Sequence, residues 1–141
     1  MTSLTLAQAN QIIAAALAHS KQAGYQPMGI AVLDDAGHLK AFAREDGASM
    51  FRCDVAVGKA YASVGMGVAS RTLLQRAKEN PQFFGALSAT AQGKFLPQTG
   101  AVVIKDKDGN VLGAAGASGA TGDEDEAVCI AGVEAAGLMH G

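Results

Sequence analysis

Two stretches of this chain share one pattern, and that pattern constrains the fold more than any other feature. Residues 28–44 and residues 100–116 each contain a short apolar run, an acidic turn that ends in glycine, and a second run of mostly small apolar residues. Apolar runs on both sides of a turn cluster are typical of β-hairpins, and Asp108-Gly109 is a strong hairpin-turn signal. The sequence therefore predicts two similar hairpins, which can together form most of one antiparallel sheet.

Capping motifs mark the helices near both ends of the chain. Thr5 with Gln8, and Thr121 with Glu124, have the spacing of a capping box, in which side chains satisfy the backbone N–H groups of a helix start. Small and apolar residues then recur near a helical period. These patterns predict one helix over residues 6–23 and another that opens within residues 119–126 and ends near residue 138.

The middle of the chain combines helical and irregular patterns. A segment rich in alanine, glycine and valine predicts a helix over about residues 52–65. Ser70 can cap a short helix that ends near Pro81, because proline disfavours helix just before itself. Residues 81–99 have little periodicity and two glycines, so we expect a long connector there, of the kind that often serves as a lid or binding loop.

The order of these elements predicts an α+β fold. A chain of 141 residues has the usual size of one domain, so we expect a single domain over residues 1–141. A protein of this size buries about two thirds of its surface on folding, which is enough for a modest core. The expected architecture is an antiparallel sheet covered by helices.

Charge and cysteine content exclude several classes of partner. The chain has 11 basic and 13 acidic residues, a net charge of −2, and only 17% charged residues. This balance lacks the positive potential that nucleic acids or anionic membranes require, so we expect neither as a partner. The low charge instead favours a homo-oligomer. Cys53 and Cys129 are far apart, which fits no disulfide framework or zinc site, and the chain shows no signal peptide, so we expect a cytoplasmic protein.

Three charged residues stand out by their positions. Lys59 is the only charged residue between Val55 and Ala69. An ammonium in such a segment either reaches the surface or is paired in a cavity. Arg44 and Asp46 follow a predicted strand, where they form a solvated turn or present a guanidinium and a carboxylate to a ligand.

The segment from the second hairpin into the last helix is the other candidate region. Its glycine-rich strand passes through Ser118 to a helix N-terminus, where bare backbone can receive an anion, although close packing explains the glycines almost as well. The acidic run at residues 123–126 caps the helix, or holds a metal or supplies a general base if Asp125 or Glu126 faces a pocket. The three histidines have no metal-ligand spacing, and we expect them at the surface without a metal site.

Four motifs follow one another along nearly the whole chain. They are the strand Gly29-Ile-Ala-Val-Leu-Asp-Asp-Ala-Gly-His-Leu39, then Arg44-Glu-Asp-Gly-Ala48, then Lys59-Ala-Tyr-Ala62, and the segment from Gly100 to Gly119 with Asp125-Glu126. This order resembles the GlcG/HbpS family, also called the haem-degrading or DUF336 family, which includes the C-terminal domain of PduO-type proteins. The resemblance implies a profilin-like fold with a five-stranded antiparallel sheet between helices, and assembly into dimers or rings up to octamers. Some relatives bind haem.

The resemblance also implies a site. Carried over to this chain, the family motif places Arg44, Asp46 and Lys59 around a cleft, with the loop before Gly100 and the turn at Ser118 opposite. The chain departs from the family in that loop, where Gly-Gly-x-Pro is common and residues 93–100 read Gly-Lys-Phe-Leu-Pro-Gln-Thr-Gly. The departure alters one wall of the cleft.

The first functional hypothesis is an oligomeric binding protein for a small ligand. Its cleft takes haem or another planar carboxylated ligand, and Arg44 or Lys59 meets the carboxylate. Haem also needs an axial donor. The candidates for that donor are His19, His140, Tyr61, Cys53 and Met66.

Two further hypotheses remain. In the second, the protein is a cofactor-independent enzyme of the isomerase or lyase type, which acts on a small carboxylated metabolite by proton transfer. In the third, it is a non-catalytic accessory subunit. In the enzyme, Asp46 or Glu126 acts as the base and Arg44 or Lys59 holds the substrate. We rank binding first, because the chain offers no dedicated nucleophile and no set of metal ligands.

Overall fold

The computed structural model describes residues 3–141. Within this range the chain forms five helices and five strands. Their bounds, in chain order, are α1 Leu6–Ala23, β1 Gly29–Asp34, β2 Leu39–Arg44, α2 Phe51–Met66, α3 Ser70–Glu79, α4 Pro81–Thr90, β3 Ala101–Lys105, β4 Val111–Ser118, α5 Gly122–Ala135 and β5 Met139–His140.

The strands form one antiparallel sheet in the order β2-β1-β4-β3-β5. Both predicted hairpins are present, as β1 with β2 and as β3 with β4, and the pairing of β1 with β4 joins them. Gly29 in β1 lies opposite Arg44 on one side and Ser118 on the other. The predicted α+β fold with a five-stranded antiparallel sheet is confirmed.

The two hairpins turn by the same local mechanism. The carboxylate of Asp34 accepts hydrogen bonds from the backbone N–H groups of Ala36 and His38, at 3.0 and 2.9 Å. Asp106 accepts from the N–H groups of Asp108 and Asn110, both at 2.9 Å. In each turn, the carboxylate of the first residue thus accepts hydrogen bonds from backbone N–H groups of the residues that follow it, which stabilises the turn.

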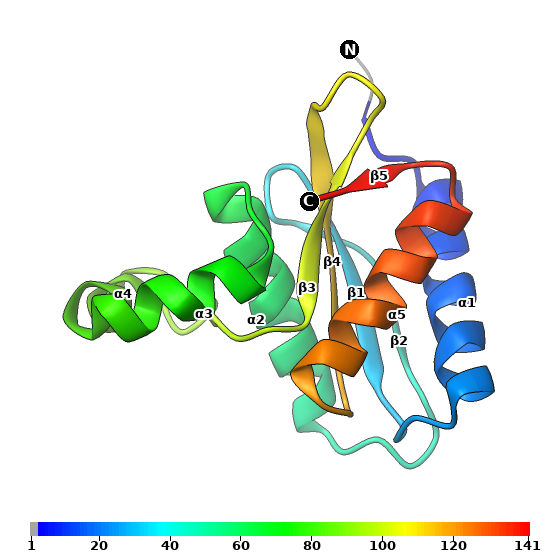
Figure 1. The fold of residues 1–141 in the computed structure, drawn as a ribbon, viewed down its shortest axis with the longest axis horizontal. Helices are drawn as coiled ribbons and strands as arrows, with labels where there is room; N and C mark the ends of the chain where they lie inside the picture. The colour runs from blue at the N-terminus through cyan, green and yellow to red at the C-terminus, as the bar shows by residue number, and fades with distance from the viewer. Residues whose placement is uncertain (1–2) are drawn as a thin grey trace.

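Helices cover both faces of the sheet. Figure 1 shows α1 and α5 on one side of the strands and α2 on the other. The larger core lies under α1 and α5, where buried residues such as Ile12, Ile30 and Val128 pack together. Under α2, Leu33 and Ala114 of the sheet pack against Ala60.

A glycine sets the distance between α2 and the sheet. A Cβ added at Gly116 in β4 would lie 2.4 Å from the carbonyl oxygen of Ala56 and 3.1 Å from the Cβ of Ala60. Both distances are shorter than ordinary van der Waals contacts. The backbone of α2 therefore rests directly on the backbone of β4, which brings the side chains of α2 to the end of the sheet.

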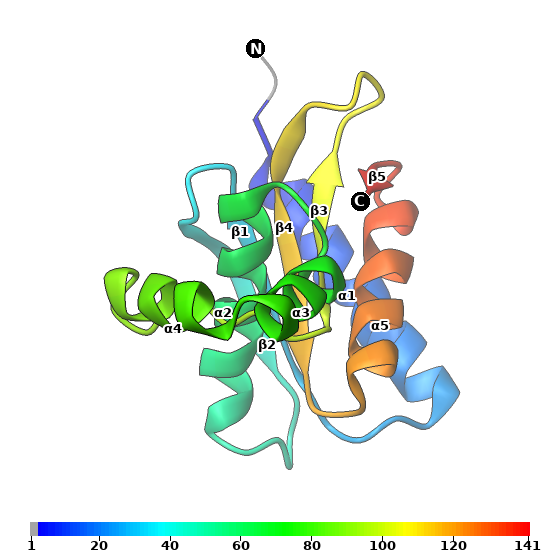
Figure 2. The same cartoon turned by 60° about the vertical axis from the view of Figure 1, so that its left-hand side comes forward.

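The segment after α2 differs from the sequence prediction. Residues 81–90 form α4, so the expected irregular connector begins only after Thr90. Pro81 occupies the first turn of α4, where its fixed backbone angle favours a helix. The apolar periodicity of this segment is weak because α4 has one buried side chain, that of Phe84. Phe84 packs in a cluster with Phe95 and Leu73. Figures 1 and 2 show α3 and α4 extending away from the sheet beyond α2.

Two predicted helix ends were also wrong. Ser70 is the first residue of α3 and not its cap, because its hydroxyl instead accepts from the N–H of Ala101 at 2.9 Å. The last helix ends at Ala135, short of residue 138, and the chain turns to form β5 beside β3. No helix among the described residues is long and apolar enough to cross a bilayer.

Candidate functional site

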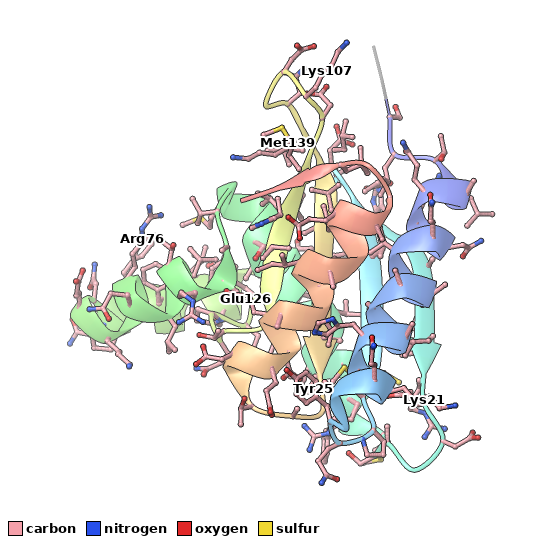
Figure 3. The ribbon with its side chains drawn as sticks, turned by 45° about the vertical axis from the view of Figure 1, so that its right-hand side comes forward. Lys21, Tyr25, Arg76, Lys107, Glu126 and Met139 are labelled. Atoms are coloured by element: carbon pink, nitrogen blue, oxygen red, sulfur yellow. The ribbon has the colours of Figure 1, made fainter. Side chains whose placement is uncertain are left out.

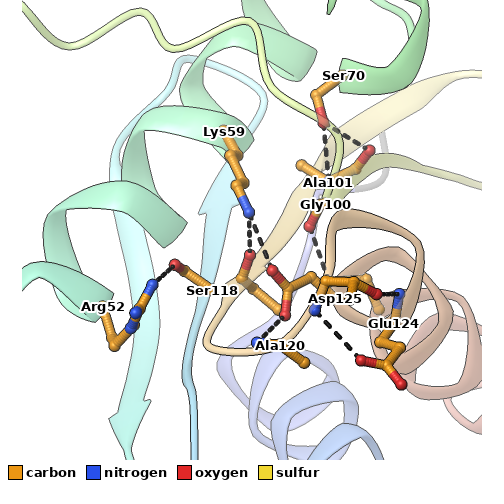
Figure 4. Close-up of polar contacts among 12 residues, drawn as sticks. Arg52, Lys59, Ser70, Gly100, Ala101, Ser118, Ala120, Glu124 and Asp125 are labelled. Atoms are coloured by element: carbon orange, nitrogen blue, oxygen red, sulfur yellow. Dashed lines mark hydrogen bonds and ion pairs between the residues drawn. The ribbon is translucent and has the colours of Figure 1, made fainter. Parts of the chain in front are cut away.

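The ammonium of Lys59 is the centre of a buried polar cluster. Lys59 is only 5% exposed, and its Nζ donates to the carbonyl oxygen of Ala117 at 3.0 Å and to Oδ2 of Asp125 at 3.1 Å (Figure 4). Removing two charges from water is costly, and the attraction within a close, hydrogen-bonded pair offsets part of that cost. Lys59 is thus paired in the interior and does not reach the surface.

Asp125 connects this ammonium to the start of α5. Its Oδ1 accepts from the backbone N–H of Ala120 at 2.9 Å, and Asp125 lies in the first turn of the helix. A carboxylate at this position is also stabilised by the helix dipole. The Lys59–Asp125 pair therefore joins α2, β4 and α5 at one end of the sheet.

Gly100 makes room for the ammonium. A Cβ at this position would lie 2.6 Å from Nζ of Lys59, and the backbone φ of Gly100 is +139°. A larger residue would both push the ammonium away and adopt an unfavourable backbone conformation. Gly100 is therefore part of the surroundings of Lys59.

Ser118 binds a second cationic side chain, that of Arg52, at the same end of β4. The Nη1 atom of Arg52 donates to the hydroxyl oxygen of Ser118 at 3.1 Å, and Ser118 itself is buried. Figure 4 shows Arg52 and Lys59 approaching the end of β4 from α2. Among residues 3–141, no carboxylate forms an ion pair with the half-buried guanidinium of Arg52.

These side chains line a hollow of about 480 Å³, which we call the polar hollow. Its walls come from α2, α3, the segment before Gly100, and the start of α5. The lining residues are Arg52, Val55, Lys59, Leu74, Gln98, Thr99, Ser118, Ala120, Thr121, Gly122, Asp123 and Asp125. The structure thus brings Lys59 and Ser118 to one hollow, with Gly100 beside them.

Arg44 and Asp46 lie elsewhere. They line a separate, open hollow of about 560 Å³ that includes Lys21 and Tyr25, which Figure 3 places near each other at one end of the molecule. The Nη1 of Arg44 donates to the carbonyl oxygen of Ala48 at 2.6 Å. Lys59 does not line this hollow, so the structure does not bring Arg44 and Asp46 together with Lys59.

Glu126 faces α3 and not the polar hollow (Figure 3). Its carboxylate is 3.2 Å from Nη2 of Arg71, which also pairs with Asp123. The acidic run therefore both opens α5 and ties it to α3. Its buried member is Asp125, which is 2% exposed.

Sequence reasoning did not single out Arg52. Arg52, Val55 and Lys59 lie three and four positions apart and share one side of α2. This spacing was visible in the sequence and could have associated Arg52 with Lys59.

The opposite flank of α2 borders a different cavity. This apolar slot has a volume of about 420 Å³, and Leu39, Phe42 and Val57 supply its apolar walls. The other lining residues are Cys53, Asp54, Gly58, Gln92, Gly93 and Lys94. A smaller hollow that contains His38 and Tyr61 adjoins it through Leu39, Val57 and Lys94. The helical period places Cys53 and Val57 on the other side of α2 from Arg52 and Lys59.

The two cysteines should differ in reactivity. Burial raises the pKa of the Cys129 thiol far above its usual range, whereas Cys53 borders the apolar slot and is partly exposed. Because the thiolate is the reactive form, we expect one thiol per native chain to react with a disulfide reagent, and two after denaturation. Cys53→Ser should abolish the native reaction. A second rapid equivalent in the native protein would contradict the buried position of Cys129.

The fold and its cavities define a small α+β domain with two ligand-sized hollows on opposite flanks of α2. Residues 4–134 match the family model described as haem degrading protein HbpS-like, so the chain belongs to this HbpS-like family and the resemblance is confirmed. No curated protein matches the chain.

Solved structures share the fold over nearly the whole chain. The PduOC:haem complex has 23% identity and a TM-score of 0.86, and the match covers 97% of each chain. Protein ORFY of Klebsiella pneumoniae has 22% identity and a TM-score of 0.87, over 97% of this chain and 93% of that one. A double mutant of HbpS from Streptomyces reticuli has 27% identity and a TM-score of 0.80, over 95% and 87%.

Proposed function

We propose that this protein binds haem, or another planar carboxylated ligand, in the apolar slot. The family is described by haem degradation, and one of the similar structures is a haem complex. The observation that carries the proposal is the composition of the slot, which combines apolar walls, a thiol and an ammonium within about 420 Å³. Ligand pockets are typically concave and mostly apolar, with a few polar groups that orient the ligand.

The residues present fit such a group. Leu39, Phe42 and Val57 would exclude water from the faces of a porphyrin, and the ammonium of Lys94 would bind a carboxylate. Cys53 is a candidate ligand that would hold the iron, since a cysteine thiolate is one of the usual haem ligands. Tyr61 in the adjoining hollow is a second candidate. Bound haem would supply an iron centre that binds small molecules or exchanges electrons.

A titration with hemin tests this proposal. We expect a Soret band in the wild-type protein, and loss of binding in Val57→Arg because the new side chain fills the slot. We expect a shifted band in Cys53→Ala, because the thiol would no longer be available to bind the iron. Val55→Arg introduces the same charge two residues away, at the polar hollow, and should leave the Soret band unchanged.

Two outcomes would count against the slot. Absence of any spectral change with hemin would overturn haem binding. Loss of the band in His19→Ala, with Cys53→Ala unaffected, would move the ligand to the hollow of Arg44 and Tyr25, since His19 lies beside Tyr25 with ring centroids 6.2 Å apart.

A further inference from the structure

Arg52 has hydrogen-bonding capacity that the protein does not use. A guanidinium carries five N–H donors in a planar fork, and Arg52 uses one of them on the hydroxyl of Ser118. No carboxylate among residues 3–141 pairs with it, although it is half-buried. The remaining donors border the polar hollow.

Lys59 has a spare donor at the same hollow. Its ammonium has three N–H groups, of which one goes to Ala117 and one to Asp125. The third has no acceptor among the described residues, and Lys59 is 5% exposed. A buried donor without a partner is costly, so a ligand acceptor at this point would be strongly favoured.

Among the described residues, one cation at the hollow has no carboxylate partner. Lys59 pairs with Asp125, and Asp123 shares Arg71 of α3 with Glu126. Arg52 is the cation without such a partner. The hollow therefore matches a monoanion better than a dianion, which the nearby carboxylates of Asp123 and Asp125 would repel.

Uncharged polar groups complete the lining. The hydroxyls of Thr99 and Ser118 and the amide of Gln98 border the hollow, and Val55 and Leu74 form a small apolar part of the wall. The N-terminus of α5 adds a favourable dipole for an anion. A ligand of this size and polarity carries hydroxyl or carbonyl groups beside its charged end.

We propose that the polar hollow binds a small monocarboxylate with a hydroxyl group next to the carboxylate. Arg52 binds the carboxylate with its planar fork, and the free N–H of Lys59 and the hydroxyl of Ser118 bind the substituent. The site is independent of the apolar slot, because the two cavities share no lining residue.

Calorimetric titration with L-lactate, acetate and inorganic phosphate tests the proposal on the full chain. We expect lactate to bind with a Kd on the order of 1 mM, and acetate to bind about tenfold more weakly because it lacks the hydroxyl. Arg52→Gln should weaken lactate binding by about tenfold or more, and Arg52→Lys nearly as much, because an ammonium cannot replace the planar fork. In NMR spectra, the backbone amide signals of Ser118 and Thr121 should shift when lactate is added.

The controls separate this site from other effects. Arg76→Gln changes an exposed arginine of α3 and should leave lactate binding unchanged, and so should Val57→Arg at the apolar slot. Circular dichroism of each variant checks that it is folded. Lactate binding that survives both Arg52 variants, phosphate binding tighter than lactate binding, or no lactate binding at all would overturn the proposal. Absence of hemin binding in the wild-type protein, with lactate binding intact, would contradict only the proposed function of the slot.

Discussion

Replacing Lys59 with methionine should lower the free energy of unfolding by about 3–5 kcal/mol, the usual cost of breaking a buried ion pair from one side. The substitution removes the ammonium but leaves the carboxylate of Asp125 in an interior where it is only 2% exposed. It also leaves the carbonyl oxygen of Ala117 without its partner. Urea denaturation of wild type and variant measures the difference.

Two further variants show whether the charge is the cause. Lys78→Met replaces an exposed lysine of α3 and should change stability by no more than about 0.5 kcal/mol. The double variant Lys59→Met/Asp125→Asn should be more stable than Lys59→Met alone, because the amide is uncharged and its oxygen can still accept from the N–H of Ala120. A double variant that is less stable than Lys59→Met would show that the uncompensated carboxylate is not responsible.

Gly116→Ala should destabilise the protein by about 3 kcal/mol, at the upper end of the range for overpacking. The added methyl group would meet the carbonyl oxygen of Ala56 and the backbone nitrogen of Ala60, at 2.4 and 3.0 Å. These are backbone atoms of a helix, which cannot rotate away as a side chain can. The thermal midpoint should fall accordingly, and α2 would have to move away from β4.

Gly85→Ala is the matched control. Gly85 lies within α4 with nothing within 4 Å of an added Cβ, so alanine should be neutral or stabilise by about 0.5–1 kcal/mol through its better helix propensity. Equal effects of the two substitutions on stability would show that the space between α2 and the sheet can accommodate a methyl group at residue 116.

Local signals in the sequence were sufficient for most of the fold. Both hairpins and both capping boxes were predicted, because turn residues and caps act within a few positions of the chain. The elements that the sequence did not predict form through contacts with residues far away along the chain. Two residues of β5 carry no periodicity of their own and form a strand only through pairing with β3. The amphipathic signal of α4 is weak because it packs through one buried residue, Phe84.

The candidate site was predictable in part. Lys59 stood out as a lone charge in an apolar segment, and the structure explains its burial by Asp125 and Ala117. Arg44 is separated from Ser118 by the strand that contains Gly29, and two strand spacings amount to about 10 Å. A linear motif contains no information about this separation. The position of Arg52 beside Ser118 depends on how α2 lies on the sheet, which the sequence alone does not specify.

The projecting pair α3–α4 has a consequence for how the molecule moves. Outside its own small cluster around Leu73 and Phe84, α3 is attached to the rest of the protein by a limited contact with α2 and β3 and by the exposed bridge from Arg71 to α5. Such a segment can open locally while the sheet stays intact, and its backbone amides then exchange with solvent sooner than those of β1 or β4. Because Leu74 of α3 is one wall of the polar hollow, each opening event also gives solutes a route into that cavity.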